Sequence, residues 1–233
     1  MKIRLAELII DLGDAGEFTR EMCSGYLADA HETADFAVSA SEDAIEQEMR
    51  IYPKADRGYI ENICLYREIC KKIVMHKAML IHSAAIAVDG KAYLFSANSG
   101  TGKTTHVNLW LEKFGSRAEV INGDKPIVRE KDGRLMVYGT PWCGKEGINN
   151  NISAPLAGIC ILKRGEKNSI ARITRLEALS ELMGQTIKPD EPSGTMKVLD
   201  TLDKIIMEIP VYRLFCNMDP EAADVAYNGM SAE

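Results

Sequence analysis

Apolar and polar residues recur along the chain with spacings that change near residue 80. Before that point, apolar residues at three- and four-residue steps predict a helix over residues 59–79. A shorter helix is predicted over residues 42–52, and apolar stretches at residues 2–12 and 35–40 predict strands. A polar break at residues 54–58 separates these elements. We therefore expect a small N-terminal α+β segment over residues 1–57, either separate from or continuous with the remainder, residues 58–233.

Beyond residue 80, strands and helices alternate. Two Asp-Gly pairs, Asp89-Gly90 and Asp132-Gly133, each lie between apolar stretches and predict hairpins. The expected strands cover residues 80–88, 91–96, 118–121, 127–130, 134–138, 156–163 and 212–215. The expected helices cover residues 104–114, 176–187 and 198–209, and residues 139–155 are expected to form a long polar loop. This order favours an α/β fold with a mixed sheet and flanking helices.

Composition excludes several classes of function. The chain has 233 residues, 46% of them hydrophobic, which is too many for a disordered protein. Its 28 basic and 34 acidic residues give a net charge of -6, so we expect neither nucleic acid nor a membrane surface as a partner. The sequence contains no long uncharged apolar run and no signal-peptide pattern. Six cysteines without paired spacing predict free thiols, and we expect a cytoplasmic protein.

One motif carries specific chemistry. Residues 96–105 read Ser-Ala-Asn-Ser-Gly-Thr-Gly-Lys-Thr-Thr, between a predicted strand and a predicted helix. The P-loop pattern is Gly, four variable residues, Gly-Lys and then Ser or Thr. Ala97 stands at the first position, where it weakens the match, and residues 102–104 agree with the pattern. The motif predicts a phosphate-binding turn.

Each part of this motif has a physical role. Gly100 and Gly102 allow the backbone to curl so that its N–H groups form an anion cradle at the start of the helix. Lys103 would place a positive charge against the β- and γ-phosphates of a nucleotide. The hydroxyl of Thr104 is a hard oxygen ligand that suits Mg²⁺. The expected ATP-binding residues are Asn98, Ser99, Gly100, Thr101, Gly102, Lys103, Thr104 and Thr105.

Two further residues are candidates for catalysis. Asp124 follows a short predicted strand about twenty residues after the motif. Its carboxylate would hold Mg²⁺ together with Thr104, or would accept the proton of an attacking hydroxyl. His82 begins the apolar stretch that precedes the motif, where an imidazole would stabilise phosphate charge or relay a proton. The other three histidines have no such context.

The polar loop contains a third candidate. Residues 139–147 combine three glycines with Trp142, Cys143 and Lys145, directly after a predicted strand. Loops at strand ends carry binding groups on a rigid scaffold. Lys145 would neutralise a phosphate or a substrate carboxylate, Trp142 would cover the site and Cys143 would line it. An ordered surface loop with Trp142 in a satellite core is the alternative interpretation.

The sequence resembles two related families at these positions. Residues 99–105 resemble the P-loop of ATP-dependent phosphoenolpyruvate carboxykinases. The wider arrangement, over residues 80–165, resembles HPr kinase/phosphorylase and its small relatives. In these a His begins the strand before the loop, as His82 does here, and an acidic motif follows a short strand, as Asp124 does. The resemblance implies a P-loop core of the carboxykinase/HPr kinase type, ATP and Mg²⁺ as ligands, and a homo-oligomer.

The chain departs from these families in two ways. Both families usually carry two adjacent Asp residues at the second motif, whereas Asp124 stands between Gly123 and Lys125. One Asp would then serve as metal ligand, as proton acceptor, or as both. The chain is also short for a complete carboxykinase, and the long helical tail by which HPr kinases engage their protein substrate is not recognisable. We therefore expect a small-molecule acceptor rather than decarboxylation or a protein substrate.

These observations predict a Mg·ATP-dependent phosphotransferase, a kinase, that acts on a hydroxyl group. Lys103 would hold the triphosphate, Asp124 or His82 would orient or deprotonate the acceptor, and Lys145 would stabilise charge on the acceptor side. One alternative is a nucleotide-binding regulatory protein with little or no phosphoryl transfer. Another is a phosphorylase or pyrophosphate-linked reaction at the same site.

Overall fold

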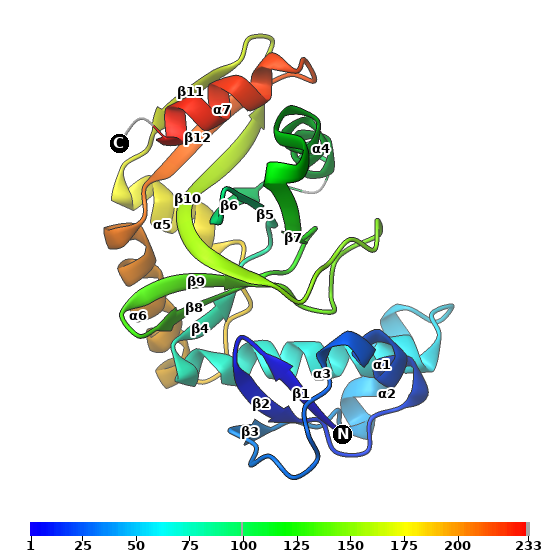
Figure 1. Cartoon of the computed structure of the whole chain (residues 1–233). Helices are drawn as coiled ribbons and strands as arrows, with labels where there is room; N and C mark the ends of the chain where they lie inside the picture. Colours follow the sequence, from blue (N-terminus) through cyan, green and yellow to red (C-terminus); the bar gives the residue numbers. More distant parts are fainter. Residues whose placement is uncertain (99, 232–233) are drawn as a thin grey trace.

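The computed structural model describes residues 1–98 and 100–231, and two β-sheets with flanking helices are present within them (Figure 1). The smaller sheet has three strands in the order β1-β2-β3. These are β1 (Lys2–Leu5), β2 (Leu8–Asp11) and β3 (Phe36–Ala37). The helices near it are α1 (Glu17–Met22), α2 (Glu42–Ile51) and α3 (Arg57–Ile73).

The larger sheet is mixed and curled. Its main order is β4-β8-β9-β10-β6-β5-β7, and β12 pairs with both β10 and β11. The long strand β10 links its parts, since it starts antiparallel to β9 and continues parallel to β6 and β12. The strands are β4 (Ala78–Leu80), β5 (Ala84–Val88), β6 (Lys91–Ser96), β7 (Ala118–Asn122), β8 (Ile127–Lys131), β9 (Arg134–Tyr138), β10 (Ser153–Arg164), β11 (Ser169–Arg172) and β12 (Val211–Cys216).

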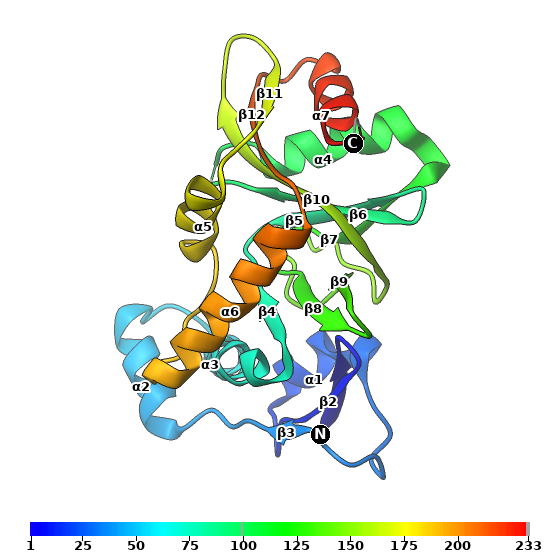
Figure 2. The same cartoon turned by 90° about the vertical axis from the view of Figure 1, so that its left-hand side faces the viewer.

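Helices cover both faces of this sheet, because its strands alternate apolar side chains between the two faces. In β6, Ala92 and Leu94 belong to the core cluster beneath α5 (Arg175–Met183) and α6 (Pro192–Glu208). Figure 2 shows α6 in front of the sheet and α5 beside it, at the left. Tyr93 and Phe95 belong to the opposite cluster, beneath α4 (Lys103–Phe114) and α7 (Glu221–Ser231). The turn from β6 into α4 is therefore held between two packed layers.

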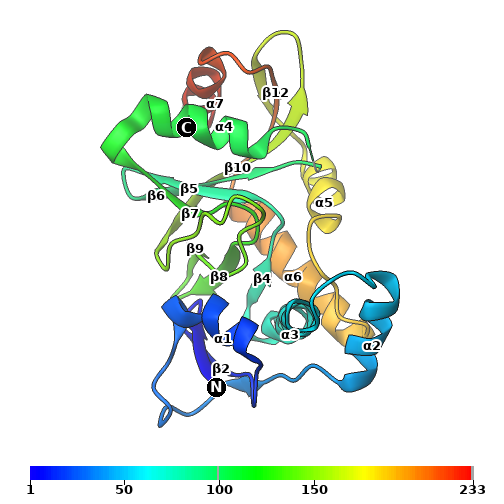
Figure 3. The ribbon, with the colours of Figure 1, turned by 90° about the vertical axis from the view of Figure 1, so that its right-hand side faces the viewer.

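The N-terminal elements share a core with the larger sheet. Helix α3 lies between the small sheet and strands β4, β8 and β9, and Figure 3 shows it end-on beside β4 and α2. One cluster of buried residues joins Ile10 of β2, Leu65 and Ile69 of α3, and Ile127 of β8. The indole of Trp142 belongs to the same cluster. The loop after β9 is therefore packed against the N-terminal elements.

The structure confirms an α/β fold with a curled mixed sheet and flanking helices. Both Asp-Gly hairpins form, and Asp89, Gly90, Asp132 and Gly133 all have the positive φ angles that such turns require. The strand expected over residues 91–96 has those limits. Strong turn residues and a continuous apolar stretch between them explain why these elements were predictable.

Several element limits were predicted wrongly. Residues 2–12 form a hairpin rather than one strand, because Ala6 and Glu7 take positive φ angles of 48° and 61° that neither residue type signals. The helix expected to reach residue 79 ends at Ile73, and after a 3-10 turn Lys77 adopts φ 55° and leads into β4. Helix α6 begins at Pro192, within a segment expected to be a turn. Strand β11 and helix α7 were not predicted.

Among the described residues, no helix combines the length and the apolar character needed to cross a bilayer.

His106 on α4 gives the stability of the fold a specific pH dependence. Its ring is 2% exposed, Nε2 accepts a hydrogen bond from Trp110 Nε1, and burial lowers its pKa from 6.5 to about 4. The unfolded chain therefore takes up a proton between pH 6.5 and 4 that the folded chain does not. We expect this residue to remove about 3 kcal/mol of stability as the pH falls through that window.

Urea unfolding of the wild type and His106→Gln at pH 7 and pH 4.5 measures this effect. The Gln side chain retains an acceptor for Trp110 and does not titrate. The variant should lose much less stability between the two pH values than the wild type does. Equal losses would show that His106 does not carry the pH dependence.

Candidate functional site

A cavity of about 850 Å³ lies between the Gly-rich turn after β6, the segment after β7, and helices α1 and α3. It brings together most of the residues that the sequence predicted to form a site. Those lining it are His82, Asn98, Gly100, Gly102, Lys103, Thr104, Thr105, Asp124 and Lys145. Thr101 belongs to the same turn but does not line the cavity, and Ser99 lies outside the described residues. The predicted ligands and the predicted catalytic groups thus face one volume.

The Gly-rich turn is built by its backbone. Gly102 precedes α4 with φ 116°, a conformation that residues with a Cβ rarely adopt. No side chain caps α4, so its first N–H groups face the turn and favour an anion there. Ala97 is buried and does not take a positive φ, so the first position of the pattern has no need of glycine here. Arg164 at the end of β10 donates to Gly100 O at 2.5 Å and supports the turn.

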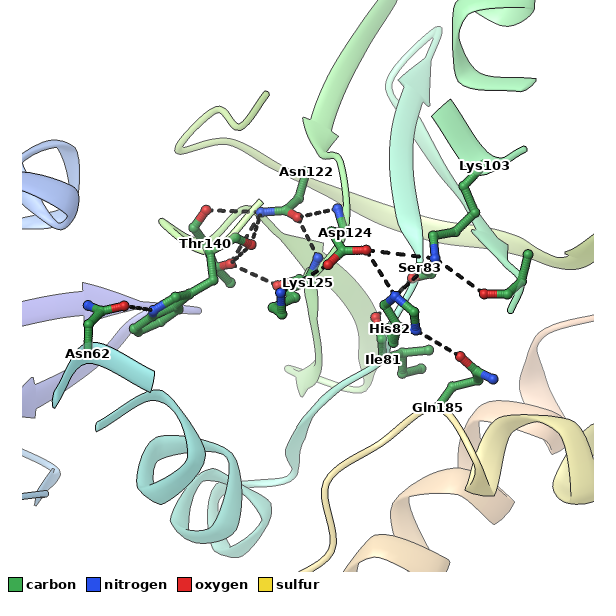
Figure 4. A network of polar contacts seen from close by, with 12 residues as sticks. Asn62, Ile81, His82, Ser83, Lys103, Asn122, Asp124, Lys125, Thr140 and Gln185 are labelled. Carbon is green, nitrogen blue, oxygen red and sulfur yellow. Dashed lines mark hydrogen bonds and ion pairs between the residues drawn. The ribbon is translucent and has the colours of Figure 1, made fainter. Parts of the chain in front are cut away.

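Three of the predicted residues form a polar cluster at the floor of the cavity (Figure 4). Nε2 of His82 lies 2.9 Å from both Asp124 Oδ1 and Lys103 Nζ. Lys103 Nζ also donates to Ala97 O at 3.2 Å and lies 3.7 Å from Asp124 Oδ1. His82 itself lies between β4 and β5, where its neighbour Ser83 donates its backbone N–H to Asp124 O. The backbone therefore holds the imidazole and the carboxylate side by side.

The charges in this cluster depend on one another. Burial alone would raise the pKa of Asp124, but hydrogen bonds from His82 and Lys125 outweigh it and hold this pKa far below its usual range. Burial lowers the pKa of Lys103, and the nearby Asp124 carboxylate offsets part of this effect. Asp124 is therefore an anion at neutral pH and serves as the counter-ion for the cations around it.

Asn122, the last residue of β7, positions Asp124. Its fully buried side chain accepts hydrogen bonds from the backbone N–H groups of Asp124 at 2.8 Å and Lys125 at 2.6 Å. Its Nδ2 donates to the carbonyl oxygens of Thr140 and Trp142 and to Thr140 Oγ1. One side chain therefore fixes both the Asp124 turn and the loop after β9.

We expect Asn122→Ala to lower the free energy of unfolding by about 3 kcal/mol, because several buried backbone groups would lose their partners. Urea unfolding measures this change. The control is Asn150→Ala, which removes a single bond, to Val120 O, from an exposed residue and should cost about 1 kcal/mol. Equal losses in the two variants would contradict the positioning role of Asn122.

A line of buried polar groups connects this turn to the N-terminal helices. Trp142 Nε1 donates to Asn62 Oδ1 at 2.9 Å, and Asn62 Nδ2 donates to Thr19 Oγ1 at 3.2 Å. Asn62 and Thr19 are fully buried, and Trp142 is 5% exposed with its ring 5.1 Å from that of Tyr66. Trp142 therefore packs in the core shared with the N-terminal elements and bonds to α3, and it also lines the cavity.

The segment after Trp142 lies directly over Asp124. Gly144 has φ 79°, and a Cβ placed on it would lie 3.1 Å from Asp124 Cβ, so this approach requires glycine. Half-buried Cys143 accepts a weak hydrogen bond from Asn149 Nδ2, and Asn149 Oδ1 accepts one from Tyr26 OH at 3.0 Å. Lys145 is exposed at the cavity and has no ion-pair partner among the described residues.

Sequence reasoning missed several residues that shape this site. Lys125 Nζ donates to Asp124 Oδ2 at 3.0 Å, although the sequence presented it only as a flanking residue. Gln185 Oε1 lies 3.1 Å from His82 Nδ1 and orients the ring. Gln185 follows α5 in a stretch with no motif, so no local signal marks it. Asn122 offered a weak signal, as an Asn at the end of a strand immediately before Gly-Asp.

The oxygen atoms of Thr104 and Asp124 suit a Mg²⁺ ion that is held mainly by water and phosphate. No group of three or more His, Cys, Asp or Glu residues among those described could hold a metal ion alone. Thr104 and Asp124 line the same cavity, and both carboxylate oxygens of Asp124 already bond to Lys125 or His82. Mg²⁺ commonly binds through one or two protein oxygens, water and substrate phosphates. The residues present suit that mode and not an all-protein cage.

Comparisons with known proteins include a distant similarity to a solved structure. No protein-family model and no curated protein sequence matches the chain. Among solved structures, the chain is similar to the Hpr(Ser) kinase/phosphatase from Coxiella burnetii, with a TM-score of 0.32 and 10% sequence identity. The match covers 56% of this chain and 93% of that one.

Proposed function

We propose that the chain is a Mg·ATP-dependent phosphotransferase that acts on a hydroxyl acceptor. One observation carries the proposal. A Gly-rich strand-to-helix turn with its lysine, Lys103, opens onto the same cavity as a half-buried Asp–His pair. Phosphoryl transfer depends mostly on positioning and on electrostatic stabilisation, and these are the groups it uses.

We assign a separate role in phosphoryl transfer to each polar group of the cavity. The N–H groups at the start of α4 and the ammonium group of Lys103 bind the phosphates. Asp124 accepts a hydrogen bond from the acceptor hydroxyl and takes its proton during transfer, and Gln185 holds His82 against it. Nε2 of the His82 ring, 2.9 Å from Asp124 Oδ1, donates to this carboxylate and holds it in place. Lys145, at the edge of the cavity, neutralises charge on the acceptor side.

Thr104 and Asp124 are the side chains that would hold Mg²⁺ together with the phosphates. The ion would supply positive charge that screens the phosphate oxygens. Lys125, which follows this single Asp, places a cation 3.0 Å from its Oδ2.

The test is transfer from γ-labelled ATP in the presence of Mg²⁺ and a fractionated cell extract. Label is followed into small molecules, proteins and free phosphate, with Lys103→Ala beside the wild type. We expect label in a small-molecule fraction, and we expect the variant to lose it. Bound ATP without any transfer would contradict the proposal.

A nucleotide-binding regulatory protein is the second candidate. The observation that favours it is the saturation of Asp124, whose two oxygens already bond to Lys125 and His82. Stoichiometric ATP binding that no extract fraction converts into turnover would support this function.

A further inference from the structure

The wall of the cavity that comes from the N-terminal helices is apolar. It is formed by the apolar side chains of Met22 on α1 and of Tyr59 and Ile63 on α3, beside the fully buried Asn62, whose amide is already paired with Thr19 and Trp142. Met22 and Ile63 are half-buried, and Tyr59 is 44% exposed. Apolar side chains that gather in a cavity beside a few polar groups are typical of ligand sites. We call these three residues the apolar wall.

The apolar wall is held in place by its own elements. Tyr59 and Ile63 are four residues apart and share a face of α3 with Asn62. The ring of Phe18 packs edge-on against Tyr59, with 5.8 Å between ring centres and an angle of 85°. Asp56 Oδ1 accepts the backbone N–H of Tyr59 at 3.1 Å and fixes the start of α3. The tyrosine ring is therefore preorganised to contact a ligand.

Buried hydrogen bonds set the position of the apolar wall relative to Asp124. Asn62, between Tyr59 and Ile63, accepts from Trp142 Nε1. The carbonyl of Trp142 accepts from Asn122, and Asn122 holds the Asp124 turn. Polar groups buried this deeply are costly unless paired, and once paired they specify a single arrangement. The wall and the carboxylate thus form one rigid unit, as a site for positioning an acceptor requires.

The reacting groups are recessed, which limits the size of an acceptor. The side chain of Lys103 is 11% exposed, that of Asp124 is 20% exposed, and the segment at Gly144 lies over Asp124. A hydroxyl group reaches Asp124 only by entering the cavity. A small molecule fits within a cavity of about 850 Å³ and can do so.

We propose that the apolar wall binds the phosphoryl acceptor, a small hydroxyl compound with an aromatic or branched aliphatic body. The body contacts Met22, Tyr59 and Ile63, and its hydroxyl points to Asp124. In the transfer, the acceptor oxygen forms a bond to the γ-phosphorus and the bond to the β,γ-bridging oxygen breaks. The hydroxyl proton passes to Asp124, and ADP leaves with the released electron pair. The inference rests on the proposed function for the chemistry but not for the binding of the apolar body.

The binding test uses 2-phenylethanol as the probe and glycerol as its polar counterpart. Saturation-transfer NMR measures both in the presence of Mg²⁺ and a non-hydrolysable ATP analogue. The wild type should bind 2-phenylethanol and should not bind glycerol. Tyr59→Ser should weaken binding of 2-phenylethanol about tenfold or more, because a ring contact is lost.

The matched control is Tyr52→Ser, since Tyr52 is 55% exposed and does not line the cavity. It should bind the probe as the wild type does. Ile63→Ser provides a second wall variant in case Tyr59→Ser fails to fold. Failure of the wild type to bind 2-phenylethanol, or equal binding by the wall variants, would overturn the inference. Loss of nucleotide affinity in the wall variants would also overturn it, because the wall would then belong to the nucleotide.

The labelling experiment gives a separate readout. Label transferred from γ-labelled ATP should appear in a product that a reversed-phase column retains at low pH, and Tyr59→Ser should raise the amount of extract needed for half-maximal labelling. Label only in unretained sugar-phosphate-like products would contradict the acceptor class. Absence of label in every fraction would count against the phosphotransferase itself, whereas probe binding would still decide whether the apolar wall is a ligand site.

Discussion

Replacing Asp124 with Asn is expected to reduce phosphoryl transfer by about 10²- to 10⁴-fold, the usual contribution of a positioned general base. The amide cannot take the proton of the acceptor hydroxyl. The amide keeps one oxygen, so one of Lys125 and His82 loses its acceptor, but Asn122 still bonds to the backbone of the turn, which should persist.

The same variant should bind ATP more tightly than the wild type when Mg²⁺ is absent. Asp124 is an anion 3.7 Å from Lys103 Nζ, and its removal leaves the cations of the cluster without their counter-ion. The triphosphate group of ATP would then bind to a site with a more positive net charge. With Mg²⁺ present this gain should shrink, because the variant also loses a metal ligand.

Transfer rates and ATP affinities with and without Mg²⁺ measure both effects. Asp200→Asn is the control, since it removes the same charge from the exposed face of α6, where Asp200 pairs with Lys197. It should behave as the wild type in every assay. Normal turnover of Asp124→Asn would remove Asp124 from the mechanism.

The sequence revealed the elements whose limits depend on local chemistry. The Asp-Gly hairpins, strand β6 and helix α4 follow from turn residues that lie next to short apolar stretches in the sequence. The small N-terminal hairpin did not, since Ala6 and Glu7 take turn conformations that tertiary packing imposes. Local signals also gave no hint that α3 would line the cavity, because that depends on contacts between residues about 80 positions apart.

Some residues of the candidate site were likewise predictable from local sequence, and others were not. A motif marks Lys103 and Thr104, and Asp124 and His82 follow from their positions near it. No motif marks the residues that position these side chains, because their role depends on contacts that form only in the folded chain. Gln185 meets His82 across 103 positions, and Asn62 meets Trp142 across 80. Such partners are polar residues with no distinctive neighbours, and only their burial together identifies them.

The second large effect is expected at Lys103, whose replacement by Ala should weaken ATP binding about 10- to 100-fold. A charge-assisted hydrogen bond to phosphate contributes about 1.5–3 kcal/mol. Lys103 is the lysine that belongs to the Gly-rich turn itself, and its Nζ already lies at the floor of the cavity. Lys103→Arg should not restore binding fully, because the planar guanidinium cannot occupy the space between Ala97 O and His82.

This loss should occur without a loss of stability. Burial lowers the pKa of Lys103, which means that the folded state disfavours its charge. Removing the ammonium group should therefore leave the midpoint of thermal unfolding unchanged or raise it. Lys113→Ala is the matched control, since it removes one positive charge from the far end of the same helix, where Lys113 pairs with Asp224. Calorimetric titration with ATP separates the variants, because Lys113→Ala should bind as the wild type does. Unchanged ATP affinity in Lys103→Ala would place the nucleotide elsewhere, whereas a lower unfolding temperature would show that this lysine supports the fold.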